Sequence, residues 1–259
     1  MRRKGRLFLA IFAGVISVAT AEISREGVIK KLIEKYQGKE FRGKLEITAR
    51  QGENYITIPC QFWVKGSKVR LDLTLKQPGL DEPMEHLILM DDKGVTIFQK
   101  KLGLVMKLDL TRLPEDMKKQ MKNVKDYTSP EQVMRQIMTL GEKLKITEKT
   151  KDGRHYYLFE VENIQELMRE LPMLDQQNIR LGKLTLWILS SDLTFERLEV
   201  FGKENQAEVV VDFKELLAEK IADSSFDLKI PSDAQVLDLT DMLLRMREAT
   251  REKKLTQPQ

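Results

Sequence analysis

Cysteine and histidine are nearly missing from this chain. Its 259 residues contain one cysteine, Cys60, and two histidines, His86 and His155. A single thiol excludes an intramolecular disulfide, and its place within an alternating apolar run favours a small buried side chain over a catalytic group. The two histidines are 69 positions apart and lack cysteine or carboxylate neighbours at a metal-ligand spacing, which argues against a zinc site.

Catalytic motifs are missing as well. The sequence has no Gly-x-Ser-x-Gly elbow, no glycine-rich phosphate loop and no histidine placed beside a candidate nucleophile. Asp91 and Asp92 lie in a predicted turn, where aspartate usually bonds to the backbone. We therefore expect a protein that is not an enzyme and that uses no cofactor or metal.

A long apolar run occurs only at the start of the chain. Four basic residues precede the apolar residues 7–18, and the small residues Ala19 and Ala21 follow. This order predicts a cleavable signal peptide over residues 1–21 and export to the periplasm, with an uncleaved anchor as the alternative. No cysteine stands at the predicted cleavage point to accept a lipid. The predicted mature protein is one domain over residues 22–250, with a polar tail over residues 251–259.

The predicted mature chain has no excess of positive or negative charge. The chain has 44 Lys and Arg against 40 Asp and Glu, and four of the basic residues lie within residues 1–21. The remaining 40 of each sign are interleaved, whereas nucleic-acid binding needs clustered, uncompensated basic residues. We therefore expect no nucleic-acid partner.

Alternation of apolar and polar residues dominates the mature chain. Ser24 is placed to cap a helix over residues 28–36, and a period of two then predicts strands. The strands are expected near residues 45–49, 56–64, 69–75, 87–90, 95–97, 104–110, 144–146, 157–161, 184–189, 195–201, 207–213 and 226–230. Helical spacing returns near residues 114–138, 164–171 and 239–246.

This order of elements predicts an α+β fold that is mainly antiparallel β. About ten or eleven of these strands form a single curved sheet around a helix-covered core, with helices inserted at the start, middle and end of the chain. Two separate β domains, divided at the helical residues 114–138, are the alternative.

Methionine is the distinctive residue type of the predicted helices. Three pairs are each spaced by four, so each pair lies on one helix face: Met117 and Met121, Met134 and Met138, Met242 and Met246. Flexible methionine surfaces suit a variable apolar ligand, and ordinary core packing is the alternative reading.

Several segments resemble the lipoprotein-carrier superfamily typified by LolA and LolB. The likeness combines the signal peptide and the opening helix that ends near Tyr36 with an early strand pair and a closing segment. The residues that carry it are Phe62, Trp63, Val64, Lys68, Val69, Arg70, Phe226, Leu228, Ile230, Pro231 and Val236.

The resemblance implies a curved, open half-barrel lidded by helices, with an apolar cavity for acyl chains. On this basis we predict that inward-facing side chains of the strands line the cavity and that the methionine helices cover it. The predicted lining residues are Phe62, Val64, Leu71, Leu73, Met106 and Trp187, and the predicted lid residues are Met117, Met121, Met134 and Met138. In this superfamily an arginine can latch the lid to the barrel, and Arg70 is the nearest match. Alternation places the Arg70 side chain on the other face of its strand from Leu71, which favours a solvated charge over a latch.

The predicted function is a periplasmic carrier or binding protein for lipid or lipoprotein acyl chains. Its partners would then include an inner- or outer-membrane donor or acceptor protein. The alternative is a non-enzymatic envelope scaffold or stress sensor that binds a protein partner with the same half-barrel.

Overall fold

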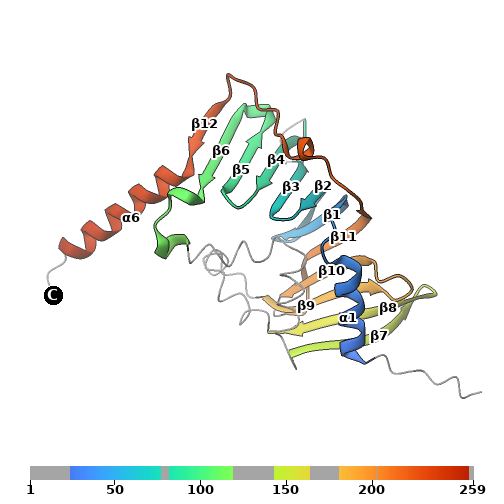
Figure 1. Cartoon of the computed structure of the whole chain (residues 1–259). Helices are drawn as coiled ribbons and strands as arrows, with labels where there is room; N and C mark the ends of the chain where they lie inside the picture. Colours follow the sequence, from blue (N-terminus) through green and yellow to red (C-terminus); the bar gives the residue numbers. More distant parts are fainter. Residues whose placement is uncertain (1–23, 77–81, 119–142, 164–180, 203, 257–259) are drawn as a thin grey trace, which may run out of the picture.

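One twelve-stranded sheet organises the chain (Figure 1). The computed structural model describes residues 24–76, 82–118, 143–163, 181–202 and 204–256. The first six strands are β1 (Phe41–Gln51), β2 (Asn54–Lys65), β3 (Lys68–Leu75), β4 (Met84–Met90), β5 (Gly94–Gln99) and β6 (Leu104–Asp109). The other six are β7 (Leu144–Lys151), β8 (Arg154–Glu162), β9 (Leu181–Leu189), β10 (Phe195–Gly202), β11 (Ala207–Ala218) and β12 (Gln235–Asp238). The helical elements are α1 (Arg25–Tyr36), α6 (Leu239–Thr256) and the short turns η1 (Lys100–Leu102), η2 (Leu110–Arg112) and η4 (Asp223–Phe226).

The sheet is open and almost wholly antiparallel. Its strand order is β12-β6-β5-β4-β3-β2-β1-β11-β10-β9-β8-β7, and only the β12–β6 pair is parallel. The β1–β11 pairing joins the strands that precede residues 114–138 to those that follow them. The predicted fold class, a mainly antiparallel curved half-barrel, is confirmed, with twelve strands in place of ten or eleven.

The predicted strand at residues 226–230 is wrong. Phe226 ends the 3-10 turn η4, and Leu228 and Ile230 pack onto the sheet without joining it. The closing strand is instead β12, which pairs with β6. Its apolar residues Val236 and Leu237 are exposed, so a four-residue edge strand carried too weak an alternation to be recognised from sequence.

Helix α1 begins and packs as its sequence predicts. The Ser24 hydroxyl accepts a hydrogen bond from the Gly27 amide at 3.2 Å, which satisfies one of the free donors of the first turn. Val28 and Leu32 are almost fully buried against the sheet. The Tyr36 ring stacks on Phe195 of β10 at 4.7 Å and so fixes the end of the helix.

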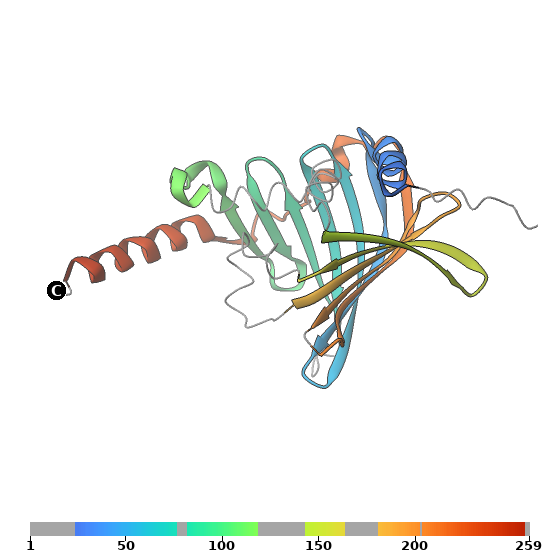
Figure 2. The same ribbon diagram turned by 90° about the horizontal axis from the view of Figure 1, so that it is seen from below.

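The sheet curves around α1. Side chains of α1 share one buried cluster with side chains of β1, β2, β7, β8 and β9. β2 and β7 are six positions apart in the strand order, about 29 Å in a flat sheet, whereas a helix of this length extends about 18 Å. The sheet therefore bends into an arch with α1 on its inner side (Figures 1 and 2). We call the face that carries α1 the inner face and the opposite one the outer face.

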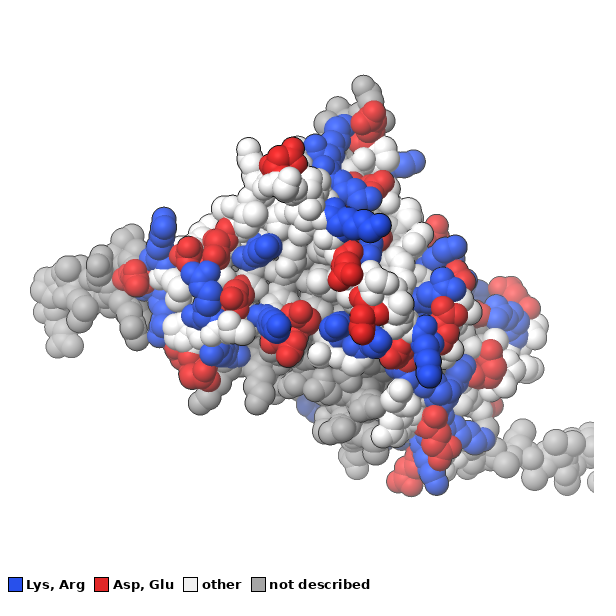
Figure 3. Space-filling view, turned by 45° about the horizontal axis from the view of Figure 1, so that its top comes forward, with Lys and Arg blue, Asp and Glu red and all other residues white. Residues whose placement is uncertain are grey.

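A segment that follows η4 covers part of the outer face. Leu87, Phe98 and Val105 of β4, β5 and β6 are buried beneath the segment that contains Leu228 and Ile230. A separate outer cluster joins side chains of β8 and β9. Elsewhere Lys, Arg, Asp and Glu intermix on the surface in Figure 3, and pairs such as Arg197 Nε with Asp212 Oδ1, 2.6 Å apart, connect neighbouring strands.

Helix α6 extends away from the sheet (Figures 1 and 2). Its first turn is fixed by Asp238, whose carboxylate accepts from the Thr240 amide at 2.8 Å and from the Arg112 guanidinium at 2.6 Å. Hydrogen bonds from the Asp241 amide and the Arg112 side chain lower the pKa of Asp238 to about 2. Within the described ranges, no helix has the length and apolar character needed to cross a membrane.

Candidate functional site

Strand register brings most of the predicted lining residues onto the inner face. Phe62 of β2 lies opposite Leu71 of β3, and Cys60 lies opposite Leu73. Val64 is two residues from Phe62 and therefore shares its face. Through Ile88 of β4 and Ile97 of β5, the row of Phe62 and Leu71 continues to Met106 of β6. Phe62, Val64, Leu71, Leu73 and Met106 therefore occupy one face, as alternation predicts.

These five residues divide into two environments. Phe62 is 8% exposed and belongs to the core under α1, against which Val64 and Leu71 also pack. Gly43 of β1 leaves room for the Phe62 ring, because a Cβ atom there would lie 2.8 Å from the ring. Leu73 and Met106 are only partly buried and lie outside this cluster.

Trp187 lies on the other side of the sheet. Its neighbours Leu186 and Ile188 face α1, so Trp187 points to the outer face, where it packs with Tyr156 at 5.5 Å between ring centroids. Its indole nitrogen donates to the Glu199 carboxylate at 2.7 Å. The structure therefore does not bring Trp187 together with the other predicted lining residues. Sequence alternation around Trp187 was ambiguous because residues 186–189 at the end of β9 are all apolar.

The predicted lid is described only at its start. Met117 is partly buried in a helical turn that follows Pro114, where the Lys118 amide donates to the Pro114 carbonyl at 2.9 Å. Met121, Met134 and Met138 lie outside the described residues, as does the helix expected over residues 164–171.

Arg70 lies on the outer face, as alternation predicts, but it is not a solvated charge. Its Nε and Nη2 atoms each donate to the Asp72 carboxylate at 2.8 Å, and Nη1 donates to the Ser225 carbonyl at 2.8 Å. The guanidinium also lies over the Trp63 ring, 5.0 Å from its centroid. Arg70 therefore holds the segment around η4 against the sheet.

The inner face of β4, β5 and β6 stays apolar beyond the reach of α1. Ile88 and Ile97 lie side by side in register, and Met90 pairs with Val95 in the next row. These side chains are partly buried, and they join no buried apolar cluster formed by the described residues. Because Leu87 and its neighbours fill the outer side of the same strands, this part of the sheet is apolar on both faces.

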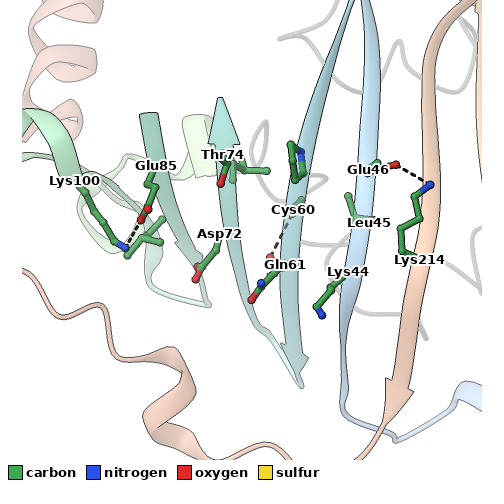
Figure 4. A pocket seen from close by; sticks show the side chains of 13 residues that line it. Lys44, Leu45, Glu46, Cys60, Gln61, Asp72, Thr74, Glu85, Lys100 and Lys214 are labelled. Atoms are coloured by element: carbon green, nitrogen blue, oxygen red, sulfur yellow. Dashed lines mark hydrogen bonds and ion pairs between the residues drawn. The ribbon is translucent and has the colours of Figure 1, made fainter. Parts of the chain in front are cut away.

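Two hollows formed by described residues differ in character. One, of about 380 Å³, crosses the outer side of β1 to β4 and is lined mainly by polar groups that pair with one another, including Lys214 with Glu46 and Lys100 with Glu85 (Figure 4). The other, of about 950 Å³, runs along α1, where Ile29 and Ile33 lie among charged side chains that include Lys30 and Glu34.

Neither a reactive thiol nor a metal-binding cluster is present in the described ranges. Burial raises the pKa of the Cys60 thiol to about 12, so the nucleophilic thiolate does not form near neutral pH. No group of three or more His, Cys, Asp or Glu side chains is placed to hold a metal ion within those ranges.

His86 was not among the site residues predicted from sequence. It lies on the inner face opposite Leu73 and Gln99 and is 8% exposed. Its Nε2 atom is buried without a hydrogen-bond partner, and burial lowers its pKa. Position 86 falls in the expected period of two, but the sequence could not show that the imidazole has no partner.

No protein-family model and no curated protein matches this sequence. Among solved structures, an uncharacterized conserved protein from Thermus thermophilus matches 81% of this chain and 96% of its own at 11% identity, with a TM-score of 0.49. The match to LprF from Mycobacterium bovis covers 80% of this chain and 95% of LprF at 12% identity, with a TM-score of 0.41. The match to a LolA superfamily protein from Nitrosomonas europaea covers 78% of this chain and 97% of that protein at 13% identity, with a TM-score of 0.33.

Proposed function

We propose that this protein binds acyl chains of lipids or lipoproteins on the inner face of its sheet and acts as an exported carrier or binding protein. The observation that carries the proposal is the apolar inner surface of β4 to β6. Ile88, Ile97 and Met106 form a continuous row there that the described core leaves only partly buried.

The energetics favour a ligand that can be held and released. Each buried methylene contributes about 0.8 kcal/mol, so a sixteen-carbon chain would contribute about 13 kcal/mol before the costs of ordering are subtracted. An acyl chain that is only partly buried on the inner face gains a fraction of this free energy. Partial burial suits a carrier, because a completely enclosed chain would dissociate very slowly.

The N-terminal sequence supports a role in the cell envelope. Its basic residues, apolar run and closing Ala19 and Ala21 are typical of a signal for export. An exported acyl-chain carrier would meet a donor and an acceptor at membranes, so protein partners at the inner or outer membrane form part of the proposal.

Native mass spectrometry of protein purified from its own envelope tests the proposal. We expect co-purifying lipid, seen as added mass and identified after extraction. The matched variants are Ile88→Asn and Leu89→Asn, which alter adjacent, partly buried residues on opposite faces of β4. We expect Ile88→Asn to weaken acyl-chain binding by tenfold or more, since it places an amide against the chain, and Leu89→Asn to leave binding unchanged. Equal binding by both folded variants would contradict the inner-face site.

Exposed apolar side chains near the C-terminus favour a second candidate function, the binding of a protein partner. Val236 and Met246 are each 60% exposed, and Leu237 and Met242 are 44% and 46% exposed. These residues form a surface on the edge strand β12 and on α6, which extends away from the sheet (Figure 1). A double Met242→Glu and Met246→Glu variant that loses an envelope partner but retains lipid would assign the two functions to separate surfaces.

A further inference from the structure

Two polar residues interrupt the apolar inner face of β4 and β5. His86 of β4 lies directly opposite Gln99 of β5, and both point to the side that carries α1. Their lateral neighbour in β3 is Leu73, and Met84 and Ile88 precede and follow His86 on the same face. The imidazole and the amide therefore form a small polar site within apolar surroundings.

The His86 imidazole is buried and incompletely bonded. The residue is 8% exposed, and Nε2 is the buried side-chain polar atom that lacks a hydrogen-bond partner within the described ranges. A buried polar group without a partner destabilises a fold, and such groups in native proteins usually have a bound water, an ion or a functional role. Burial also lowers the pKa of His86, so the side chain is neutral at pH 7 and has one donor and one acceptor nitrogen.

The apolar row next to this polar site is long enough to contact much of an acyl chain. Outside the buried core that holds Phe62, it crosses the four strands β3 to β6, and three steps of about 4.8 Å give a length of about 14 Å. This part of the row consists of Leu71, Ile88, Ile97 and Met106. An acyl chain whose polar end lies at His86 and Gln99 would place its first methylenes against Ile88 and Ile97 in the adjacent row.

We propose that His86 is the residue that binds the polar end of the acyl ligand, with Nε2 donating a hydrogen bond to its carbonyl oxygen and Gln99 beside it. The ligand class is therefore an acyl chain with a terminal carbonyl oxygen, either a free acid or an ester. This inference rests on the proposed function, because it assigns a contact within the same site. It adds selectivity for oxygen-bearing chains over plain hydrocarbons, which an apolar surface alone would not provide.

Binding of three probes to purified full-length protein tests the assignment. Palmitic acid and methyl palmitate have the carbonyl oxygen, and diphenylhexatriene is a fluorescent hydrocarbon without one. Both tryptophans point to the outer face, so a hydrocarbon probe reports on the inner face better than intrinsic fluorescence does. We expect His86→Leu to weaken palmitic acid and methyl palmitate about tenfold and to leave diphenylhexatriene unchanged. His155→Leu, which alters the exposed histidine, should bind all three probes like the wild type.

Each outcome decides the question. If His86→Leu binds palmitic acid as tightly as the wild type does, the His86 assignment is overturned and the apolar site remains. If the folded wild type binds neither palmitic acid nor diphenylhexatriene, the proposed function fails and this inference fails with it. An effect on palmitic acid alone identifies the free acid as the ligand, and an effect on both oxygen-bearing probes includes the ester.

A measurement on the unaltered protein covers the case in which His86→Leu does not fold. The chain has only two histidines, so ¹⁵N-histidine spectra resolve His86 and His155. We expect palmitic acid to shift the His86 Nε2 resonance and diphenylhexatriene to leave it in place. A His86 signal that does not respond to bound palmitic acid would overturn the assignment.

Discussion

Replacement of Arg70 by alanine should loosen the segment that closes the outer face of the sheet. The Arg70 guanidinium donates to both oxygens of Asp72 and to the Ser225 carbonyl, each at 2.8 Å, and lies over the Trp63 ring. The Arg70 side chain is 18% exposed and that of Asp72 is 24% exposed, so solvent screens the pair only in part. Residues just after Ser225 pack over the outer cluster of β4, β5 and β6.

The expected loss of unfolding free energy for Arg70→Ala is about 3 kcal/mol. Hydrogen bonds between charged partners contribute about 1.5–3 kcal/mol, the cation–π contact adds about 0.5–1 kcal/mol, and the carbonyl of Ser225 loses its donor. Arg70→Lys should cost about half as much, because lysine keeps the charge but cannot bond both carboxylate oxygens. A double-mutant cycle with Asp72→Ala should return a coupling energy of about 1–2 kcal/mol.

Urea unfolding measures the loss, and hydrogen exchange locates it. We expect faster exchange over residues 223–230 in Arg70→Ala before the rest of the sheet opens. Arg42→Ala is the control: Arg42 pairs with Glu219, but its side chain is 49% exposed, so the expected loss is below about 1 kcal/mol. If Arg70→Ala destabilises no more than Arg42→Ala, or if exchange over residues 223–230 is unchanged, Arg70 does not hold the segment.

Three further predictions follow from buried groups. Leu32→Ala should lower the free energy of unfolding by about 2–5 kcal/mol, because Leu32 of α1 is 0% exposed where the helix packs on the sheet; a loss below about 1 kcal/mol in urea titration would contradict the packing. Because burial raises the pKa of Cys60 to about 12, the native thiol should resist Ellman's reagent at pH 8 and react fully in urea; rapid native reaction would refute its burial. Burial lowers the pKa of His86 below its ordinary 6.5, so the unfolded chain binds this proton more readily and wild-type stability should fall as pH drops below about 6.5. His86→Leu should lose less stability than wild type in thermal melts between pH 7 and 5; parallel curves for wild type and His86→Leu would rule out this linkage.

The fold could be predicted largely because its elements are marked locally. The Ser24 cap, the helical spacing of Val28 and Leu32, and unbroken alternation such as that of residues 69–75 each depend on neighbours in sequence. Pairing partners are different, because β1 meets β11 across more than 150 residues. The same is true of β12, whose four residues acquire strand geometry only by pairing with β6.

The candidate site could be predicted where one face of a strand is polar. Leu71 and Leu73 alternate with Arg70 and Asp72, so their common face was evident. Trp187 lies in the wholly apolar end of β9, so its side of the sheet was not evident until its pairing with Leu158 placed it on the outer face, away from Leu186. Alternation identifies two faces but cannot say which one turns toward α1.

The sequence by itself determined the antiparallel sheet, the opening helix and the common face of Leu71 and Leu73, because periodicity and capping act over a few residues. Only the tertiary structure decided which face curves around α1, that Arg70 binds the returning chain, and that His86 Nε2 has no partner. These features depend on contacts between residues far apart in sequence. A polar group's partners are fixed only when the whole chain has folded, so the polar site beside the apolar row could be found only in the assembled sheet.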